Sequence, residues 1–211
     1  ARLIANFSIH RVGEDEAFIL VETSLKDTLL NHLESYHFRE EVEFSTLDGQ
    51  LLAIQGPKSS LILEKVFNQK NLLDKPNDIL KLTLGKHQVN LIIKSLTGEE
   101  GQILCFPNEL ECELTQLILK TDPPPIQVHE AAREVLRIEA GIPIYNKDMD
   151  KKNILPETGL EHTSVSYNKG CYIGQEVIAR IKTYGAPNFA LMGLTVEGVI
   201  TPPYNGTLKL E

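Results

Sequence analysis

The alternation of apolar and polar residues predicts a chain that opens with a β-hairpin followed by a helix. Residues 2–12 and 16–22 are rich in β-favouring residues, and the Gly13-Glu14-Asp15 stretch between them is typical of a turn. Ser24 is the expected N-cap of the helix. Apolar residues then recur at helical spacing, at Leu25, Leu29, Leu30, Leu33 and Tyr36.

The next stretch predicts two more strands and a second helix. Residues 42–45 alternate in polarity, Asp48-Gly49 favours a turn, and residues 51–54 return as a strand. Pro57 then leads into a helix that we expect over residues 59–67. The first third of the chain therefore reads ββαββα.

The rest of the chain mixes short strands and helices without strict βαβ alternation. We expect a connection over 68–78, strands at 79–84, 88–95 and 102–106, a helix from Pro107 to about Lys120, a stiff proline spacer at 122–125 and a helix over 128–139. Residues 144–168 are loop-rich, and residues 189–196 begin a new strand pattern. This order of elements predicts an α+β fold.

Composition narrows the classes of function. The chain has 211 residues, of which 24% are charged and 42% hydrophobic, as in an ordinary globular protein. Its net charge of −8 argues against direct binding to a nucleic-acid backbone, but it is compatible with a local basic pocket for an anionic small molecule. No apolar run approaches membrane-spanning length and no signal-peptide pattern occurs, so we expect no membrane partner.

The spacing of cysteine and histidine predicts no metal site. Cys105, Cys112 and Cys171 form no CxxC pair, which favours neither a disulfide framework nor a zinc site. The six histidines show no HxxH or HExxH spacing. Unpaired cysteines fit a reducing compartment, and we expect a cytoplasmic protein.

The stretch from Lys169 to Glu176, which reads KGCYIGQE, is the strongest functional lead. Its glycines let the backbone approach a ligand closely. Lys169, and a helix beginning near Gly174, would both favour the thiolate of Cys171. Two alternatives stay open: a glycine-rich connector that carries an inert cysteine, and a catalytic pairing of Cys171 with His162.

This stretch resembles the K-G-C-[YF]-x-G-Q-E signature of the YgfZ-type folate-binding proteins, which are relatives of the glycine cleavage T-protein, an aminomethyltransferase. Further segments resemble family sequences in the family's order: LAIQGPK at 52–58, TGEEG at 97–101 and LRIEAGIP at 136–143. The resemblance implies an α+β, T-protein/YgfZ-like fold with mixed sheets and flanking helices, followed by the start of a C-terminal β-barrel.

The resemblance also implies a function and its residues. Tetrahydrofolate or a one-carbon derivative is the implied cofactor, and the implied role is the assembly or repair of iron–sulfur enzymes, tRNA-modification enzymes among them. Those enzymes, or assembly proteins, are the implied partners. Cys171 is the expected reactive residue, tuned by Lys169, and Glu99 is expected to hold the pterin ring through two parallel hydrogen bonds. The other implied folate contacts are Arg133, Arg137, Gln175, Glu176 and Arg180. For Gln175 and Glu176 the alternative is that they hold the loop of the signature in place.

Glu99 and the two arginines each have an alternative interpretation. A carboxylate in a polar turn is commonly just solvated. Arg133 and Arg137 lie one helical turn apart, where the resemblance places an arginine toward the anionic glutamyl tail of a folate. Glu130 and Glu134 lie beside them, so a solvated ion-pair face is the alternative.

One departure from the T-protein separates two functions. The strand that carries its catalytic aspartate matches residues 1–6, where Ala5 and Asn6 replace both aspartates of the family sequence. An amide cannot supply a carboxylate's charge or take up a proton. The sequence therefore favours the folate-binding, iron–sulfur role. A folate-dependent aminomethyltransferase is the first alternative, and a structural binding module with an inert cysteine is the second.

The resemblance also suggests how the chain is divided. We expect a first α+β unit over residues 1–67, a second over 68–168, and the signature with the start of the barrel over 169–211. In the family a further segment precedes residues 2–6 and the barrel continues beyond Leu210, so we expect a fragment of a longer protein.

Overall fold

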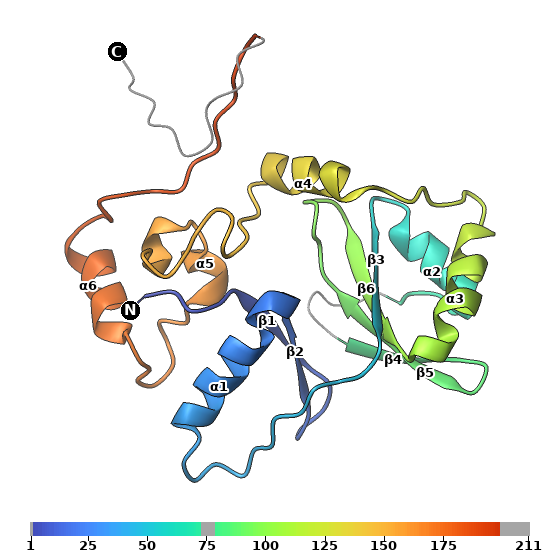
Figure 1. The fold of residues 1–211 in the computed structure, drawn as a ribbon, viewed down its shortest axis with the longest axis horizontal. Helices are drawn as coiled ribbons and strands as arrows, with labels where there is room; N and C mark the ends of the chain where they lie inside the picture. The colour runs from blue at the N-terminus through green and yellow to red at the C-terminus, as the bar shows by residue number, and fades with distance from the viewer. Residues whose placement is uncertain (1, 73–78, 199–211) are drawn as a thin grey trace.

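The computed structural model describes residues 2–72 and 79–198 and has an α+β architecture (Figure 1). A two-stranded antiparallel sheet joins β1 (Phe7–Arg11) to β2 (Ala17–Val21), and a four-stranded antiparallel sheet has the order β3-β6-β5-β4. The strands of the larger sheet are β3 (Gln50–Gln55), β4 (Ile79–Leu84), β5 (His87–Ile93) and β6 (Gly101–Phe106). The helices are α1 (Lys26–Tyr36), α2 (Ser59–Phe67), α3 (Glu111–Leu119), α4 (Glu130–Glu139), α5 (Glu161–Ser164) and α6 (Gln175–Tyr184), with 3-10 turns at Thr23–Leu25, Asn108–Leu110 and Leu155–Glu157.

Helices α2 and α3 cover one face of the four-stranded sheet (Figure 1). Side chains alternate between the two faces along each strand, so Leu91 of β5 lies opposite Leu104 of β6, and both are fully buried. They belong to one core cluster with Leu63 of α2 and Leu114 of α3. Because full burial of a leucine stabilises a fold by about 1.5–3 kcal/mol, this cluster fixes the sheet and the loops at its ends.

The β1–β2 hairpin lies against the opposite face of the sheet. On that face Ile79, Ile92 and Ile103 form a second cluster, and Phe18 and Leu20 of β2 pack against it. The sheet is therefore buried between two helices on one side and a hairpin on the other. This packing brings the start of the chain close to the loop between β5 and β6.

The hydrophobic pattern located most elements, but the first quarter of the chain needs three corrections. The first strand begins at Phe7 because the segment before it pairs elsewhere, the N–H of Leu3 donating to the carbonyl of Asn153 at 3.1 Å. Residues 42–45 form no strand, since they are mostly exposed and pair with no other strand. Ser24 does not cap α1 but lies inside the 3-10 turn Thr23–Leu25, and α1 has no side-chain cap.

The end of the chain also differs from expectation. Residues 189–196 form no strand, and their side chains are exposed. The expected start of a C-terminal β-barrel therefore has no strand among the described residues, and residues 199–211 lie outside them. Of the connection expected over 68–78, the part from 73 to 78 likewise lies outside the described residues.

Candidate functional site

The turn at residues 97–101, which carries Glu99, is held by the junction between β3 and α2. The side chain of Gln55 accepts a hydrogen bond from the N–H of Leu96 (2.7 Å) and donates one to the carbonyl of Lys94 (3.2 Å). The carbonyl of Glu100 accepts from the N–H of Gly56 at 2.7 Å. These bonds join the LAIQGPK segment to the TGEEG segment, although some 40 residues separate the two along the chain.

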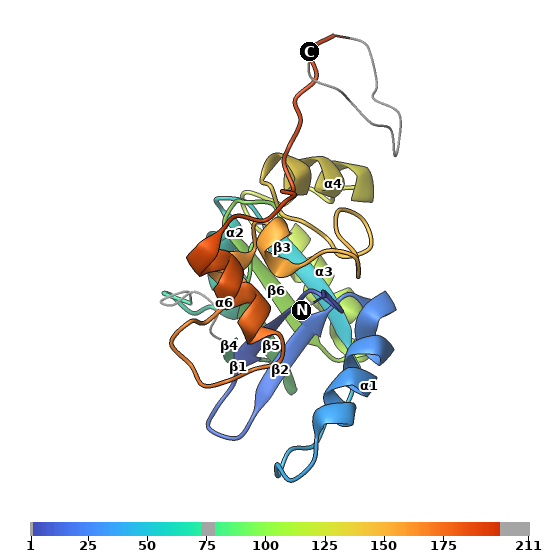
Figure 2. The same ribbon diagram turned by 90° about the vertical axis from the view of Figure 1, so that its left-hand side faces the viewer.

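Two glycines of this turn lie in close contact with neighbouring residues. Gly98 has a φ of +85°, and a Cβ placed there would lie 2.7 Å from the Cβ of Ala140, just beyond α4. A Cβ on Gly101 would clash with the side-chain amide of Gln55 unless that amide moved. The turn therefore packs closely against the end of the LRIEAGIP segment. Figures 1 and 2 show α4 beyond the end of the sheet where β3 ends and β6 begins.

The carboxylate of Glu99 projects from this fixed turn into solvent. Residue 99 is exposed, and its side chain makes no hydrogen bond or ion pair with any other described residue. Glu100 differs, because its Oε1 accepts from the Nε2 of Gln102 at 3.2 Å. Glu99 is thus an unengaged acceptor on a rigid backbone, and its predicted contact with a pterin stays a prediction.

The two arginines of α4 are engaged in ion pairs within the protein. Arg133 donates from Nε to Oε2 of Glu130 at 2.9 Å. Arg137 is only 3% exposed and donates to the carboxylates of Glu134 and Asp148, the latter at 2.8 Å. Both arginines therefore form the ion pairs of the alternative interpretation, but Arg137 is buried rather than solvated. Their predicted contact with a folate tail is not tested by it.

The ion pair of Arg137 has an electrostatic consequence. The hydrogen bond from Arg137, followed by that from Lys147, lowers the pKa of Glu134 from its ordinary 4.5 to about 2. Asp148 also accepts from the N–H of Ile144 at 2.7 Å. The network thus ties the end of α4 to the loop that follows it.

The KGCYIGQE segment leads into α6. Gly174 has a φ of +84° and lies immediately before the helix, which confirms the predicted helix start. The Nζ of Lys169 lies 5.0 Å from the centre of the Tyr172 ring, and Cys171 is exposed. Of the expected ligand contacts in this region, Gln175 is half-buried, whereas Glu176 and Arg180 are exposed.

The predicted site residues are not gathered in one place. The turn with Glu99 lies beside α4, whereas Figure 1 shows α6 well apart from both. His162 lies on α5 and, although both residues are described, forms no hydrogen bond with Cys171. Within the described ranges, no group of three or more histidine, cysteine, aspartate or glutamate side chains is placed to hold a metal ion.

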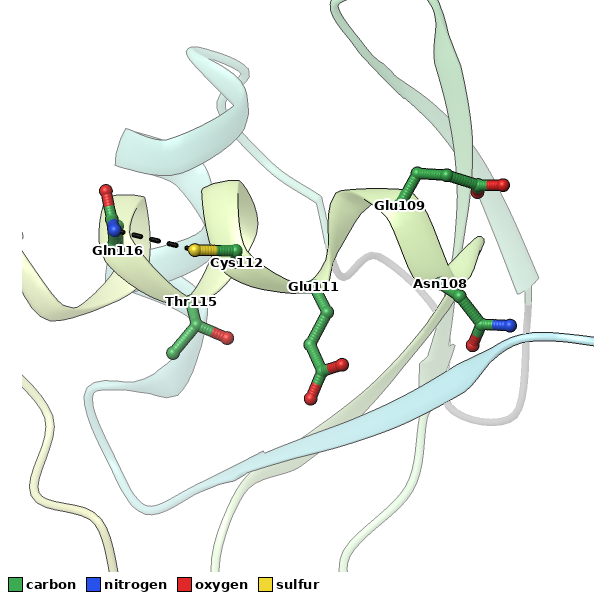
Figure 3. Close-up of a pocket in the computed structure, with 6 residues that line it drawn as sticks. All are labelled: Asn108, Glu109, Glu111, Cys112, Thr115 and Gln116. Carbon is green, nitrogen blue, oxygen red and sulfur yellow. Dashed lines mark hydrogen bonds between the residues drawn. The ribbon is translucent and has the colours of Figure 1, made fainter.

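Two of the hollows in the described surface contain no predicted site residue. One of about 400 Å³ runs along α3 beside Cys112, whose Sγ accepts from Nε2 of Gln116 at 3.6 Å (Figure 3). The other, of about 130 Å³, lies between the loop after α4 and the segment that follows α6. It is lined by Asp148, Met149, Asn153, Glu157, Thr158, Phe189, Ala190 and Leu191.

Sequence reasoning missed one polar cluster. The Nζ of Lys94 donates to the Oγ of Ser8 at 2.8 Å, and that Oγ lies 2.8 Å from the Nε2 of His10. The available signal was the placement of Ser8 and His10 at alternate positions of a predicted strand, which puts both on one face. Lys94 reaches them only because the hairpin packs on the sheet.

Comparison with known proteins establishes the family. The family model described as the GCVT N-terminal domain matches residues 1–169, so the chain belongs to this family. An aminomethyltransferase from Chlorobium limicola is 28% identical, covering 95% of this chain and 56% of the relative. One from Halothermothrix orenii is 29% identical, covering 98% and 58%. The chain thus spans about half the length of the curated relatives it matches.

A solved structure shares the fold. The glycine cleavage system aminomethyltransferase T from Bartonella henselae matches with a TM-score of 0.67, at 20% identity, over 74% of this chain and 42% of that chain. The predicted T-protein-like α+β fold and GcvT-like relationship are thereby confirmed. None of the helices in the described part is long and apolar enough to cross a membrane.

Proposed function

We propose that this chain is the tetrahydrofolate-binding part of a YgfZ-type, GcvT-like protein that supports the assembly or repair of iron–sulfur proteins. The observation that carries the proposal is the exposed thiol of Cys171 within KGCYIGQE, just before α6. An accessible thiolate is a nucleophile and a soft ligand for iron or sulfur species. A cysteine that served only packing would be buried, as Cys105 is.

Family membership and the geometry of the turn support the folate half of the proposal. The matched relatives are aminomethyltransferases, and aminomethyl transfer of the glycine cleavage type uses tetrahydrofolate. Glu99 offers two carboxylate oxygens, which suit the adjacent amino and N–H groups of a pterin. Because the hydrogen bonds of Gln55 and Gly56 already fix the turn, little entropy would be lost when a ligand binds there.

A folate-dependent aminomethyltransferase is the second candidate, and the names of the relatives favour it. Against it stand Ala5 and Asn6, neither of which can take up a proton as a carboxylate does. The Nδ2 of Asn6 donates to the carbonyl of Pro143 at 3.4 Å, so this amide serves to attach the N-terminal segment to the loop after α4.

Calorimetry with tetrahydrofolate tests the ligand. Glu99→Gln keeps the shape of the side chain but removes its charge, and should weaken binding by about 1–3 kcal/mol. Glu100→Gln on the same turn is the matched control and should bind normally. If wild type and Glu99→Gln bind tetrahydrofolate with equal affinity, Glu99 is a solvated carboxylate of the turn and does not contact the ligand.

A complementation experiment tests the role. In cells lacking the protein, Cys171→Ala should fail to restore the activity of an iron–sulfur tRNA-modification enzyme, whereas Cys112→Ala should restore it. Full rescue by Cys171→Ala would contradict the proposal. Robust transfer of an aminomethyl group to tetrahydrofolate by the purified protein would instead favour the second candidate.

A further inference from the structure

Lys94 is half-buried between the hairpin and the sheet, at the base of the Glu99 turn. It directly follows β5, and its backbone is held on both sides: its N–H donates to Gly101 (2.9 Å) and its carbonyl accepts from Gln55 (3.2 Å). Its side chain points to the hairpin face, where Nζ donates to the Oγ of Ser8 at 2.8 Å. The ammonium is therefore fixed in position by backbone and side-chain bonds together.

The charge of Lys94 has no counter-ion among the described residues. Lys81 and Lys147 each have a carboxylate oxygen at 3.0 Å, from Glu16 and Glu134. The side chain of Lys94 faces instead the hydroxyl of Ser8 and, beyond it, the imidazole of His10. An ammonium group has three hydrogens, so two remain without an acceptor in the described part of the chain.

Even partial burial of an uncompensated ammonium costs free energy. Desolvation accordingly lowers the pKa of Lys94 below its ordinary value, and no neighbouring charge opposes this shift. An anion placed beside the two unused hydrogens would remove the penalty. The cations that the sequence suggested for an anionic ligand, Arg133 and Arg137, are already bonded to carboxylates of the protein.

We propose that the Lys94 ammonium, with the Ser8 hydroxyl beside it, binds an oxyanion, and that this oxyanion is a carboxylate of the bound folate's glutamyl tail. The second half rests on the proposed function. The glutamyl carboxylates are the anionic groups of tetrahydrofolate at neutral pH, and Lys94 is five residues from Glu99 on the same loop. Glu99 would then hold the pterin end and Lys94 the tail.

The test compares two ligands that differ only at the tail. Tetrahydrofolate carries the glutamyl group, and tetrahydropteroate lacks it. Lys94→Met keeps the apolar stem without the charge, and should weaken tetrahydrofolate binding at least tenfold while changing tetrahydropteroate binding less than twofold. Lys81→Met, which removes an exposed paired lysine, should leave both affinities unchanged. Equal losses for both ligands, or no loss for either, would overturn the assignment.

A second measurement needs no variant, which matters if Lys94→Met fails to fold. A carboxylate beside Lys94 favours the charged form and raises its lowered pKa, so binding at alkaline pH should take up protons. Calorimetry in buffers of different ionisation enthalpy should detect this uptake with tetrahydrofolate and not with tetrahydropteroate. Absence of uptake with tetrahydrofolate across the alkaline range contradicts the proposal.

Inorganic phosphate separates this inference from the proposed function. If the wild type binds neither folate ligand, the proposed function fails, and with it the assignment to a glutamyl tail. The oxyanion site is then tested with phosphate alone. If phosphate raises the melting temperature of the wild type and not that of Lys94→Met, the site is supported. An equal rise in both proteins rejects it.

Discussion

Gln55 and Leu96 are joined by a hydrogen bond of 2.7 Å, from the backbone N–H of Leu96 to Oε1 of Gln55. The other half of the same amide donates to the carbonyl of Lys94 at 3.2 Å. One side chain of β3 thus satisfies two backbone groups in the loop that follows β5. Because both groups are partly buried, water cannot fully replace the amide. The backbone that carries Glu99 and Lys94 is positioned in this way.

Removing this amide should destabilise the fold. Gln55→Leu leaves the N–H of Leu96 and the carbonyl of Lys94 without partners, and we expect a loss of about 1–3 kcal/mol in the free energy of unfolding. Gln50→Leu is the control on the same strand, since it removes an exposed bond to Asn108 and should cost about 0.5 kcal/mol or less. Urea denaturation measures both. Equal effects would mean that Gln55 does not hold the loop.

The contact between Gly98 and Ala140 makes a second prediction. Gly98→Ala places a non-glycine residue at a φ of +85° and a Cβ 2.7 Å from that of Ala140, so it should cost about 2–4 kcal/mol. Gly159→Ala has a similar φ of +72° but open space, and should cost about 1 kcal/mol. Combining Gly98→Ala with Ala140→Gly should restore the part of the stability that the steric clash removes. The cost of the positive φ at residue 98 should remain. If Gly98→Ala and Gly159→Ala destabilise the protein equally, the close contact with Ala140 adds no cost at residue 98.

The ion pair between Arg137 and Glu134 predicts a pH dependence of stability. Because the folded-state pKa of Glu134 is lowered from 4.5 to about 2, its contribution is present above pH 4.5 and is lost as the pH falls toward 2. Arg137→Met should destabilise the protein by about 1–3 kcal/mol at neutral pH, since the partner carboxylates keep some exposure to water.

The difference in the free energy of unfolding between wild type and Arg137→Met should therefore decrease as the pH is lowered from 4.5 to 2. Thermal or urea unfolding across that range provides the measurement. Lys147 is the second partner of Glu134 and is more exposed than Arg137. Lys147→Met should therefore destabilise the protein less than Arg137→Met does, with the same pH dependence. If the difference in the free energy of unfolding is the same at all pH values, the ion pair with Arg137 does not affect the protonation of Glu134.

The sequence predicted the elements that have a strong local pattern. Residues 103–106 are an apolar run, the whole strand from Gly101 to Phe106 is buried on both faces, and the predicted strand over 102–106 is confirmed there. Residues 42–45 alternate in polarity but form no strand, because alternation does not supply a neighbouring strand to bond with. Ser24 failed as a cap because a 3-10 turn moved the helix start beyond it.

The sequence predicted the segments of the candidate site but not the contacts between them. The family segments were found along the chain, but the sequence did not indicate that Gln55 bonds to the loop of the TGEEG turn or that Gly98 meets Ala140. Lys94 and Ser8, which are 86 residues apart, meet only through the packing of the hairpin on the sheet. Such contacts depend on tertiary structure, which residue spacing does not encode.

Cysteine reactivity separates the proposed role of Cys171 from an inert one. Cys105 lies on β6 with 8% of its surface exposed, and desolvation raises the pKa of its thiol. We expect an alkylating reagent at neutral pH to spare Cys105 in the folded protein and to modify exposed Cys171 and Cys112. Peptide mass spectrometry against time gives each rate.

The comparison between the two exposed thiols is decisive. Cys112 lies on α3 and accepts a hydrogen bond from Gln116, whereas Cys171 follows Lys169, whose Nζ is held over the ring of Tyr172. We expect Cys171 to react first, and Lys169→Ala to slow it several-fold without changing Cys112. Lys182→Ala removes the lysine over Tyr167 instead and serves as the matched control, with no effect expected at Cys171. If Cys112 reacts as fast as Cys171 and Lys169→Ala changes nothing, the surroundings of Cys171 do not activate it, and the KGCYIGQE segment is a connector.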